Sequence, residues 1–376
     1  MKVVIAIDSF KGSMTSLQAG ESAAVGVKRV YPDADVRVIP VADGGEGTVD
    51  ALVAGMGGDM ISIVAKDPLM RDIECSYGIV DGTAIVEMAA ASGITLVSDS
   101  ERNPLNTTTY GVGQIIKDAM ERGVRNFVIG IGGSATNDGG TGMLSALGFE
   151  FEDSNGNPIP QGAKGLEALC TIKNDNAFET LGECRFSIAC DVTNPLCGEE
   201  GCSAVYGPQK GADEAMIKDM DKWLASYARL AGKLCPDADA DYPGSGAAGG
   251  MGFAFRTFLS GQLKSGIDLI LKEVKLEESV KDADLVITGE GRLDFQTSMG
   301  KAPAGIAAIA KKYGVPVVAF AGGVTPQAKA VHDVGIDAYF PIVRGVCTLE
   351  DAMNSQNAQS NMADAVEEVM RIVNLY

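Results

Sequence analysis

The sequence predicts an α/β protein with two lobes, one a doubly wound parallel-sheet domain and the other a larger mixed α/β domain inserted into it. Three observations predict this class. Apolar strand patterns alternate with helical patterns at both ends of the chain, glycine-rich loops follow the strands, and the chain has 376 residues. Because a single hydrophobic core rarely grows beyond about 250–300 residues, we expect two domains.

The N-terminal segment follows the order strand, glycine loop, helix. An apolar run over 3–7 predicts a buried strand, a helical period predicts a helix over 15–30, and a second strand is predicted over 36–41. Another helix is expected from Thr48. This alternation is typical of parallel sheets, in which a helix returns the chain to the start of the next strand.

The segment 61–87 has a different pattern. It contains short runs with alternating polar and apolar residues, separated by turn signals at Asp67-Pro68 and Asp81-Gly82. Since such runs are typical of antiparallel strands, we expect a change of architecture here.

The middle of the chain returns to longer elements. A helix is predicted over 107–123, a strand over 127–133, another strand over 186–190, and an amphipathic helix over 214–234. The stretch 235–246 is acidic and contains proline and glycine, which makes it the best candidate for a linker or a lid.

From Asp284 the alternation of strands and helices resumes and continues to a final helix over 358–373. The simplest topology places residues 1–60 and 284–376 in one discontinuous doubly wound domain, with residues 61–283 inserted as the second domain. The active-site cleft is then expected between the two.

The charge balance excludes several classes of partner. The chain has 31 Lys and Arg against 50 Asp and Glu, a formal net charge of -19. Such a surface repels nucleic acids and anionic membranes, so we expect neither as a partner. The same field repels an anionic substrate, so any anion site must be made locally positive by Lys, Arg, a helix N-terminus or a metal ion.

Cysteine and histidine content narrows the chemistry and the compartment. The eight cysteines form no CxxC pair, no stretch approaches the ~20 apolar residues of a membrane span, and no signal-peptide pattern is seen, so we expect a cytoplasmic protein. The sequence has one histidine, His332. Serine–histidine and cysteine–histidine mechanisms are therefore disfavoured, and proton transfer is left to Asp, Glu, Lys or Tyr.

Six loops carry charged or amide side chains, five of them together with glycines, and most follow directly after a predicted strand. They are 8–13, 42–47, 130–140, 190–195, 206–211 and 288–297. In open α/β sheets ligands bind at the carboxyl ends of the strands, so these loops are the candidate binding segments.

Known phosphate motifs do not explain these loops. Gly300-Lys301 is followed by Ala302, so no Walker-type loop is present. The run GSGAAG at 244–249 matches G-x-G-x-x-G but follows no predicted strand, which argues against a dinucleotide fingerprint. The glycines of 244–252 fit close packing and an anion-facing loop equally well.

The loop residues fit phosphoryl transfer best, because that reaction needs positioning and charge stabilisation more than a strong nucleophile. Lys11 and Arg292 supply positive charge. Carboxylates that suit Mg²⁺ are Asp8, Asp43, Glu46, Asp191, Glu290 and Asp294. The alternative is that Asp8 and Asp43 cap helices and that Arg292 and Asp294 form a surface ion pair.

Several of these runs together resemble the bacterial type I glycerate kinase family. They are DSFKGSMTS, PVADGGEGTVDAL, GIGGSATNDGGTGMLSALG, CDVTNPL with GPQKGA, GSGAAGGMG and DLVITGEGRLDFQTSMGKAP, in order along nearly the whole chain. The resemblance implies ATP-dependent and Mg²⁺-dependent phosphorylation of glycerate, with 2-phosphoglycerate favoured. It also implies a flavodoxin-like or Rossmann-like lobe interrupted by a larger insert.

Residue type and placement then suggest individual roles. We expect Lys11 and Arg292 to hold the carboxylate of glycerate and the transferring phosphoryl group, and Asp191, or else Asp294, to orient or deprotonate the attacking hydroxyl. Candidates for ATP phosphates are Gly132, Gly133, Ser134, Asn137, Gly246, Gly249 and Gly250. Candidates for glycerate are Asp8, Ser9, Asp43, Glu46 and Lys210, and candidates for the metal are Asp138 and Glu290.

Two other functions stay open. One is a nicotinamide-dependent oxidoreductase, and the other is a non-catalytic two-lobed protein that binds a small acid. The sequence decides neither which hydroxyl of glycerate is phosphorylated nor whether the chain forms a homo-oligomer.

Overall fold

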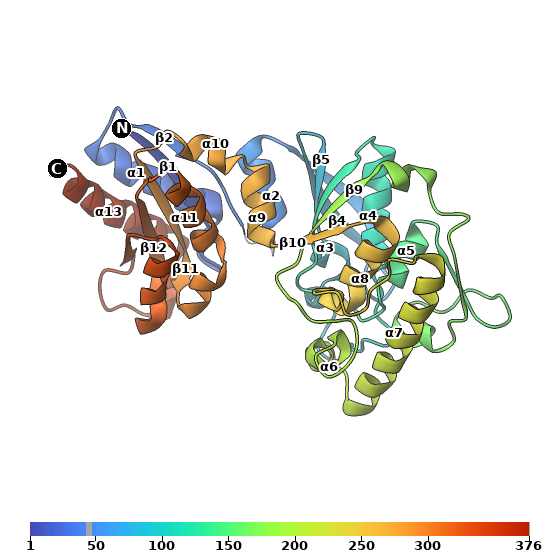
Figure 1. The fold of residues 1–376 in the computed structure, drawn as a ribbon. Helices are drawn as coiled ribbons and strands as arrows, with labels where there is room; N and C mark the ends of the chain where they lie inside the picture. Colours follow the sequence, from blue (N-terminus) through green and yellow to red (C-terminus); the bar gives the residue numbers. More distant parts are fainter. Residues whose placement is uncertain (43–46, 376) are drawn as a thin grey trace. The chain divides into compact units, whose positions relative to one another are not determined.

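The computed structural model describes residues 1–42 and 47–375. The chain forms two compact units, which are described separately. The first unit combines residues 1–43, 50–57 and 267–376, and the second combines residues 44–49 and 58–266. Figure 1 shows the N-terminal and C-terminal segments, coloured blue and red, side by side in the first unit.

The first unit contains a five-stranded sheet in which all neighbours are parallel. Its strands are β1 (Lys2–Ile7), β2 (Asp35–Val38), β11 (Leu285–Leu293), β12 (Val317–Val324) and β13 (Ala338–Pro341). They lie in the order β13-β12-β11-β1-β2. Counted along the chain this is the flavodoxin-like order 2-1-3-4-5, in which the strand order reverses between β1 and β11.

Helices cover both faces of this sheet. One face carries α1 (Ser16–Val30) and α13 (Ser355–Val373), and the other carries α9 (Gly266–Glu273), α10 (Leu276–Val280) and α11 (Ala302–Lys312). The two short helices α2 (Thr48–Met56) and α12 (Leu349–Met353) complete the set. Along β1, Val3 and Ile5 pack on the α1 side and Val4 on the α11 side, which explains why the strand reads as a continuous apolar run.

The boundary of this unit differs from the sequence expectation, which placed it at residue 284. The unit already resumes at residue 267 because α9 and α10 bury Ile267, Leu271 and Val280 in the same core as Ile306 of α11. A helix pattern alone does not show which sheet the helix covers.

Local signals fix the start of α1. Thr15 accepts a hydrogen bond from the backbone N–H of Gln18 at 3.2 Å, and the side chain of Gln18 accepts one from Thr15 N at 3.0 Å. This reciprocal capping box satisfies amides at the helix start. At Gly26 a Cβ would lie 2.3 Å from the carbonyl oxygen of Ala363, so the close approach of α1 and α13 requires glycine there.

The second unit contains a six-stranded mixed sheet in the order β10-β9-β6-β5-β4-β3. Its strands are β3 (Asp59–Lys66), β4 (Asp72–Val80), β5 (Thr83–Glu87), β6 (Asn126–Gly130), β9 (Arg185–Ala189) and β10 (Gln262–Lys264). The first three pair antiparallel and the last four pair parallel, which confirms the change of architecture expected over 61–87. A separate hairpin consists of β7 (Glu150–Glu152) and β8 (Thr171–Lys173).

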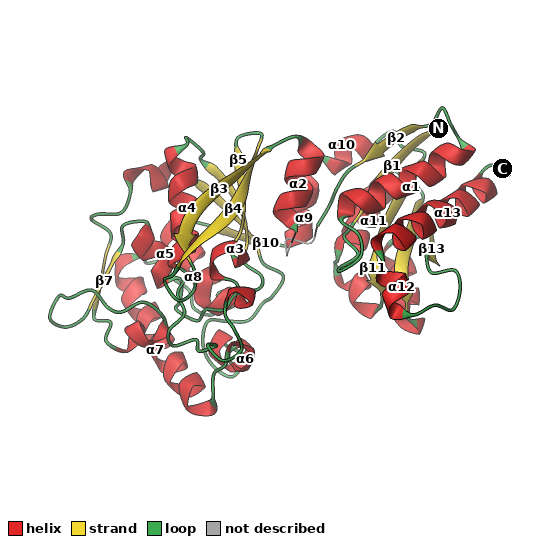
Figure 2. Cartoon of the chain, turned by 180° about the vertical axis from the view of Figure 1, so that it is seen from behind, coloured by secondary structure: helices red, strands yellow, loops and turns green. Residues whose placement is uncertain are grey.

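The helices of the second unit are α3 (Ala89–Ser92), α4 (Tyr110–Glu121), α5 (Thr141–Ala146), α6 (Cys202–Tyr206), α7 (Glu214–Leu234) and α8 (Ala247–Leu259) (Figure 2). The core under them is aromatic: Phe127 stacks on Phe186 with ring centroids 4.9 Å apart, and Tyr227 is fully buried. The stretch 235–246 is not the connection between the units, because it lies within this unit, where Ala240 O accepts from Leu196 N at 2.8 Å.

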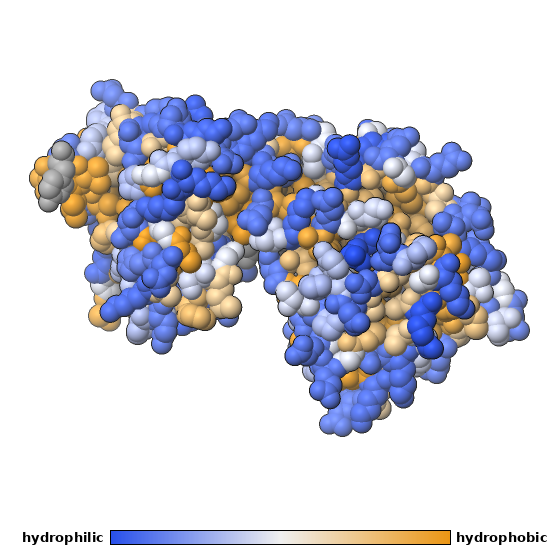
Figure 3. All heavy atoms as spheres, viewed as in Figure 1, coloured by the Kyte–Doolittle hydropathy of each residue, from blue (hydrophilic) through white to orange (hydrophobic). Residues whose placement is uncertain are grey.

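Hydrophilic side chains cover much of the face shown in Figure 3, and exposed apolar side chains occur in smaller groups. Among the residues that the structure describes, no helix has both the length and the apolar composition needed to cross a membrane.

Candidate functional site

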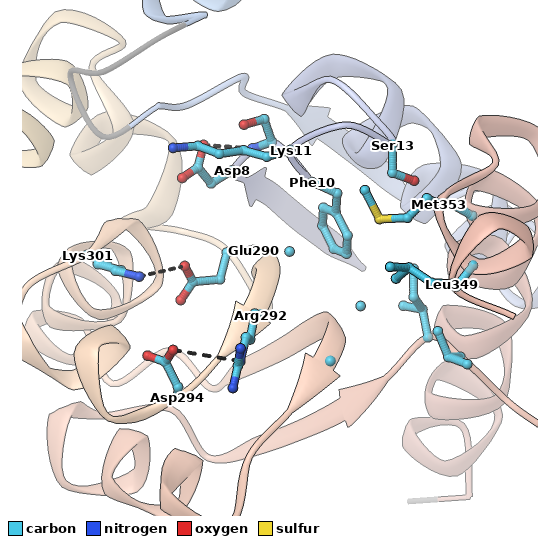
Figure 4. Close-up of a pocket in the computed structure, with 18 residues that line it drawn as sticks. Asp8, Phe10, Lys11, Ser13, Glu290, Arg292, Asp294, Lys301, Leu349 and Met353 are labelled. Atoms are coloured by element: carbon cyan, nitrogen blue, oxygen red, sulfur yellow. Dashed lines mark hydrogen bonds and ion pairs between the residues drawn. The ribbon is translucent and has the colours of Figure 1, made fainter. Parts of the chain in front are cut away.

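A cavity of about 490 Å³ lies in the first unit, at the carboxyl ends of β1, β11, β12 and β13 (Figure 4). This place includes the switch point between β1 and β11, where doubly wound sheets bind their ligands. Its charged side chains are Asp8, Lys11, Glu290, Arg292, Asp294 and Lys301. Five of these six were expected in the site; Lys301 was seen in the sequence but set aside with the rejected Walker motif.

The sheet itself positions the carboxylates of this pocket. Asp8 directly follows β1, and its N–H donates to Gly289 O of β11 at 2.9 Å, so the Asp8 backbone stays joined to the neighbouring strand. Glu290 lies within β11 and is buried. It accepts a hydrogen bond from Thr297 Oγ1 at 2.5 Å, and Lys301 Nζ lies 3.7 Å from its second oxygen.

The cations of the pocket are only loosely paired. Arg292 Nε lies 3.9 Å from Asp294 Oδ2, and 70% of the Arg292 side chain is exposed. Within the described part of the chain, no carboxylate lies within 4.0 Å of Lys11 Nζ. A long contact at an exposed position contributes little energy, so both side chains can turn to an anionic ligand.

Asp294 has a local structural role. It is the N-cap of the 3₁₀ helix Phe295–Met299, where its Oδ1 accepts from Gln296 N at 2.9 Å. Its own N–H donates to Thr297 Oγ1 at 3.1 Å. The sequence did not suggest this capping role for Asp294, and it argues against a role as the base.

Small residues leave space at the pocket floor. Gly322 and Gly323 lie near the end of β12 and line the pocket, and a Cβ at Gly323 would meet no atom within 4 Å. At Gly322 a Cβ would lie 2.8 Å from Gly291 O, so this strand pair requires glycine to close. Gly322 therefore allows a close contact between the strands, and Gly323 leaves open space for a ligand.

A second candidate edge lies in the second unit, where the parallel strands β5, β6, β9 and β10 end. Gly132 and Gly133 follow β6 and are exposed, and Asp191 follows β9 and is also exposed. Asp191 Oδ1 accepts from Gly266 N at 2.9 Å, which joins the ends of β9 and β10.

Ser9, which was expected at the substrate, lines the pocket of the first unit.

Asp138 does not fit the metal role expected from the sequence. It is completely buried, and its carboxylate accepts from Thr109 N and Thr109 Oγ1 at 2.9 Å each and from Gly140 N at 3.0 Å. Thr108 Oγ1 and Gly142 N complete its surroundings. Burial raises the pKa of the Asp138 carboxyl. Five donors occupy this group, so it fixes the loop rather than facing a ligand.

Lys210 lies in a different setting from the one expected. The segment 206–211 follows no strand; it ends α6 and forms the 3₁₀ helix Pro208–Lys210. The buried Lys210 Nζ donates to Ser134 Oγ at 2.8 Å and to Thr136 O at 2.6 Å. Burial lowers the pKa of Lys210 to about 8. Lys210 therefore supports the loop after β6 from beneath, a pairing that the sequence did not reveal.

Several glycines expected at ATP phosphates serve packing instead. Gly246, Gly249 and Gly250 are buried. A Cβ at Gly249 would lie 2.1 Å from Thr136 O, and one at Gly246 would lie 2.2 Å from Pro195 O. Their amides are enclosed, and of the two glycine loops only Gly132 and Gly133 keep an exposed backbone.

Asn137 is buried as well, with Nδ2 donating to Ser203 Oγ at 2.8 Å. It therefore packs within the second unit rather than at an exposed phosphate site. Asp43 and Glu46, expected at the substrate, lie outside the described residues. In the part of the chain that is described, no three His, Cys, Asp or Glu side chains converge as a metal cage.

A doubly wound sheet with cations and carboxylates at its switch point defines a class, that of α/β proteins with a charged ligand pocket at the carboxyl ends of the strands. Comparison with known proteins makes the class specific. The chain belongs to the glycerate kinase family, whose sequence model matches residues 3–374.

Relatives match over nearly their whole length. The chain is 46% identical to a glycerate kinase of Haemophilus influenzae, covering 99% of each chain. It is 48% identical to a glycerate kinase of Bacillus subtilis, over 94% of this chain and 93% of the relative. It is 46% identical to a glycerate 2-kinase of Escherichia coli, over 98% of this chain and 97% of the relative.

A solved structure agrees with the fold. The crystal structure described as a putative glycerate kinase 2 from Salmonella typhimurium LT2 has a TM-score of 0.93 to this chain at 44% identity. The match covers 100% of this chain and 98% of that one. These matches confirm the glycerate kinase family that the sequence motifs predicted.

Proposed function

We propose that this protein transfers the γ-phosphoryl group of ATP to D-glycerate and that the product is 2-phosphoglycerate. One observation carries the proposal: cations and carboxylates meet at the switch point of a chain that matches proteins named glycerate kinase over nearly its whole length. The name of the Escherichia coli relative, glycerate 2-kinase, supports the choice of hydroxyl.

Lys11 and Arg292 are assigned to the transferring phosphoryl group. Phosphoryl transfer spreads negative charge over the equatorial oxygens, and fixed cations stabilise that charge. The loose pairing of Arg292 and the absence of a described carboxylate within 4.0 Å of Lys11 Nζ leave both free to bind phosphate oxygens.

Asp191 is assigned to the hydroxyl that attacks. It lies exposed at the end of β9, and the hydrogen bond from Gly266 N fixes one of its oxygens. A carboxylate that accepts the hydroxyl proton orients the acceptor and assists its attack. Asp294, the second choice from the sequence, is the weaker candidate because it caps a helix.

The oxygen donors of the first pocket suit Mg²⁺. Mg²⁺ is usually held by one or two carboxylates together with water and substrate phosphates, so the lack of a described three-residue cage does not argue against it. Asp8 and Glu290 would hold the ion. When bound there, the ion would supply positive charge that offsets part of the negative charge of the phosphates.

The branch of the family and the cellular compartment are inferred from the sequence. We infer the bacterial type I branch of the family and a cytoplasmic enzyme, since the substrate ATP is made and used there. A homo-oligomer is compatible with the proposal, which does not depend on it.

A coupled assay tests the function. The protein is incubated with D-glycerate, ATP and Mg²⁺, and ADP release is followed. Enolase without phosphoglycerate mutase is then added to the products, since enolase dehydrates 2-phosphoglycerate only. We expect glycerate-dependent ADP release and formation of phosphoenolpyruvate. Folded protein without glycerate-stimulated turnover would overturn the proposal, and turnover that needs mutase would assign the other hydroxyl.

A further inference from the structure

The pocket in the first unit has two chemically different walls. Figure 4 shows Lys301, Glu290 and Arg292 on one side and Leu349 and Met353 on the other. Phe10 lies between them. The two walls come from distant parts of the chain, the polar one mainly from β11 and the apolar one mainly from α12.

The apolar wall of the pocket is exposed to solvent. Leu349 is 78% exposed and Met353 38% exposed, although both line the pocket. Phe10 is only 4% exposed and is held by the core under β1. Two exposed apolar side chains around a fixed aromatic ring form a surface that a flat apolar ligand group can cover.

The cavity has room for a ligand considerably larger than glycerate. About 490 Å³ lies within the range of about 300–1,000 Å³ found for drug-sized ligands. Glycerate is a three-carbon hydroxy acid without apolar surface, so it would leave Leu349 and Met353 uncovered. The occupant must combine an apolar flat part with an anionic part.

The polar wall is suited to a polyphosphate. Besides Lys11, Arg292 and Lys301, this wall contains the start of α11, whose N-cap residue Lys301 makes no capping hydrogen bond with its side chain. The positive end of the helix dipole therefore adds to the charge of the three cations, which the carboxylates of Asp8, Glu290 and Asp294 partly offset.

We propose that this pocket binds ATP, with the adenine and ribose against Phe10, Leu349 and Met353 and the polyphosphate directed toward Lys11, Arg292 and Lys301. The inference rests on the proposed function and goes beyond it, since it assigns the nucleotide to one unit. It also replaces the expectation that the loops 132–140 and 244–252 hold the ATP phosphates. The second of those loops is closed by packing at Gly249 and Gly250.

The experiment compares Leu349→Gln and Met353→Gln with a matched control, Ile372→Gln. Ile372 is also an exposed apolar residue on a helix of the first unit, 54% exposed, but it does not line the pocket. Binding of a non-hydrolysable ATP analogue and of inorganic tripolyphosphate, both with Mg²⁺, is measured by calorimetry on the full chain. The KM values for ATP and D-glycerate are measured in parallel.

We expect Leu349→Gln to weaken analogue binding and raise the KM for ATP about tenfold, because the base loses an apolar contact. Met353→Gln should act in the same direction. Tripolyphosphate binding and the KM for glycerate should stay within about twofold of wild type, as should all values of Ile372→Gln. Only a pocket wall that contacts the base would weaken binding of the ATP analogue without weakening binding of tripolyphosphate.

The opposite results identify which proposal fails. If both pocket variants bind the analogue as Ile372→Gln does, or if the KM for glycerate rises instead, the nucleotide assignment is wrong. If the analogue binds in a Leu349-dependent manner but no glycerate is phosphorylated, the pocket assignment holds and the proposed function fails.

Discussion

Lys210 Nζ donates a hydrogen bond to Ser134 Oγ at 2.8 Å from a buried position beneath the loop that follows β6. A protonated lysine has no acceptor, so the Ser134 oxygen must accept this bond and its own proton is left for another partner. Because Ser134 adjoins the exposed Gly132 and Gly133, the pair keeps a hydroxyl donor oriented at the end of the strand.

This relationship predicts a pH dependence. The pKa of Lys210 is lowered from 10.5 to about 8 by burial, while Cys202 and Asp138 act in the opposite direction. Below pH 8 the lysine donates to Ser134, and above it the neutral amine can accept the serine proton instead. We expect kcat/KM of the wild type to fall as the pH rises through about 8.

The matched variants for this profile are Lys210→Met and Lys222→Met. Lys210→Met should lower kcat/KM at neutral pH and remove the decline near pH 8. Lys222→Met changes an exposed lysine and should leave the pH profile unchanged. An alkaline decline that persists in Lys210→Met would contradict the assignment. The free energy of unfolding should change in the opposite direction to kcat/KM. Burying the charged lysine destabilises the fold fully below pH 8, and this destabilisation disappears as the pH rises toward 10.5.

Asp191→Asn tests the base. The asparagine keeps an oxygen that can accept from Gly266 N, so the ends of β9 and β10 should stay joined. We expect kcat to fall about 10²–10⁴-fold with little change in the KM for ATP, because only proton acceptance is lost. Steady-state kinetics with Glu199→Gln, an exposed acidic control, checks this. A kcat within about threefold of wild type would remove Asp191 from the mechanism.

Lys11→Ala tests the phosphoryl contact. Removing a cation that stabilises the transition state should lower kcat/KM about 10²-fold or more. The thermal midpoint should be unchanged, since Lys11 is exposed and no ion pair to a described carboxylate is broken. Lys329→Ala, at another exposed lysine of the same unit, should match wild type. Equal kinetics of the two variants would show that Lys11 is not in the site.

Asp138→Asn separates a structural carboxylate from a metal ligand. The substitution places an amide N–H against N–H and O–H donors in a buried site, so we expect a loss of about 2–4 kcal/mol in the free energy of unfolding. Thermal unfolding measures this loss, and a titration of activity with Mg²⁺ serves as the second readout. An unchanged midpoint with weakened Mg²⁺ dependence would restore the metal role.

Much of the local structure could be predicted from the sequence. The strand at 2–7, the helix at 214–234 and the strand beginning at 285 were all expected, because each is a continuous run with a clear period and a glycine or proline boundary. Pocket-lining residues were predicted where a strand end delivers them directly, as at Asp8 and Arg292.

Other parts of the site were not predictable in this way. Nothing in the run YGPQKG shows that Lys210 lies under Ser134, which is 76 residues earlier in the chain. The glycines of GSGAAG read equally as a phosphate loop, and only the carbonyl of Thr136, 2.1 Å from a Cβ at Gly249, shows that they allow two loops to pack.

The sequence by itself determined the family, the order of strands and helices, and the charged residues that end β1 and β11. The tertiary structure decided which of these residues share a space. Periodicity and turn chemistry act over a few neighbouring residues and can be read along the chain. The pocket wall that joins Phe10 to Leu349 and Met353 depends on sheet order and helix packing, which bring distant segments together, and no local pattern encodes that contact.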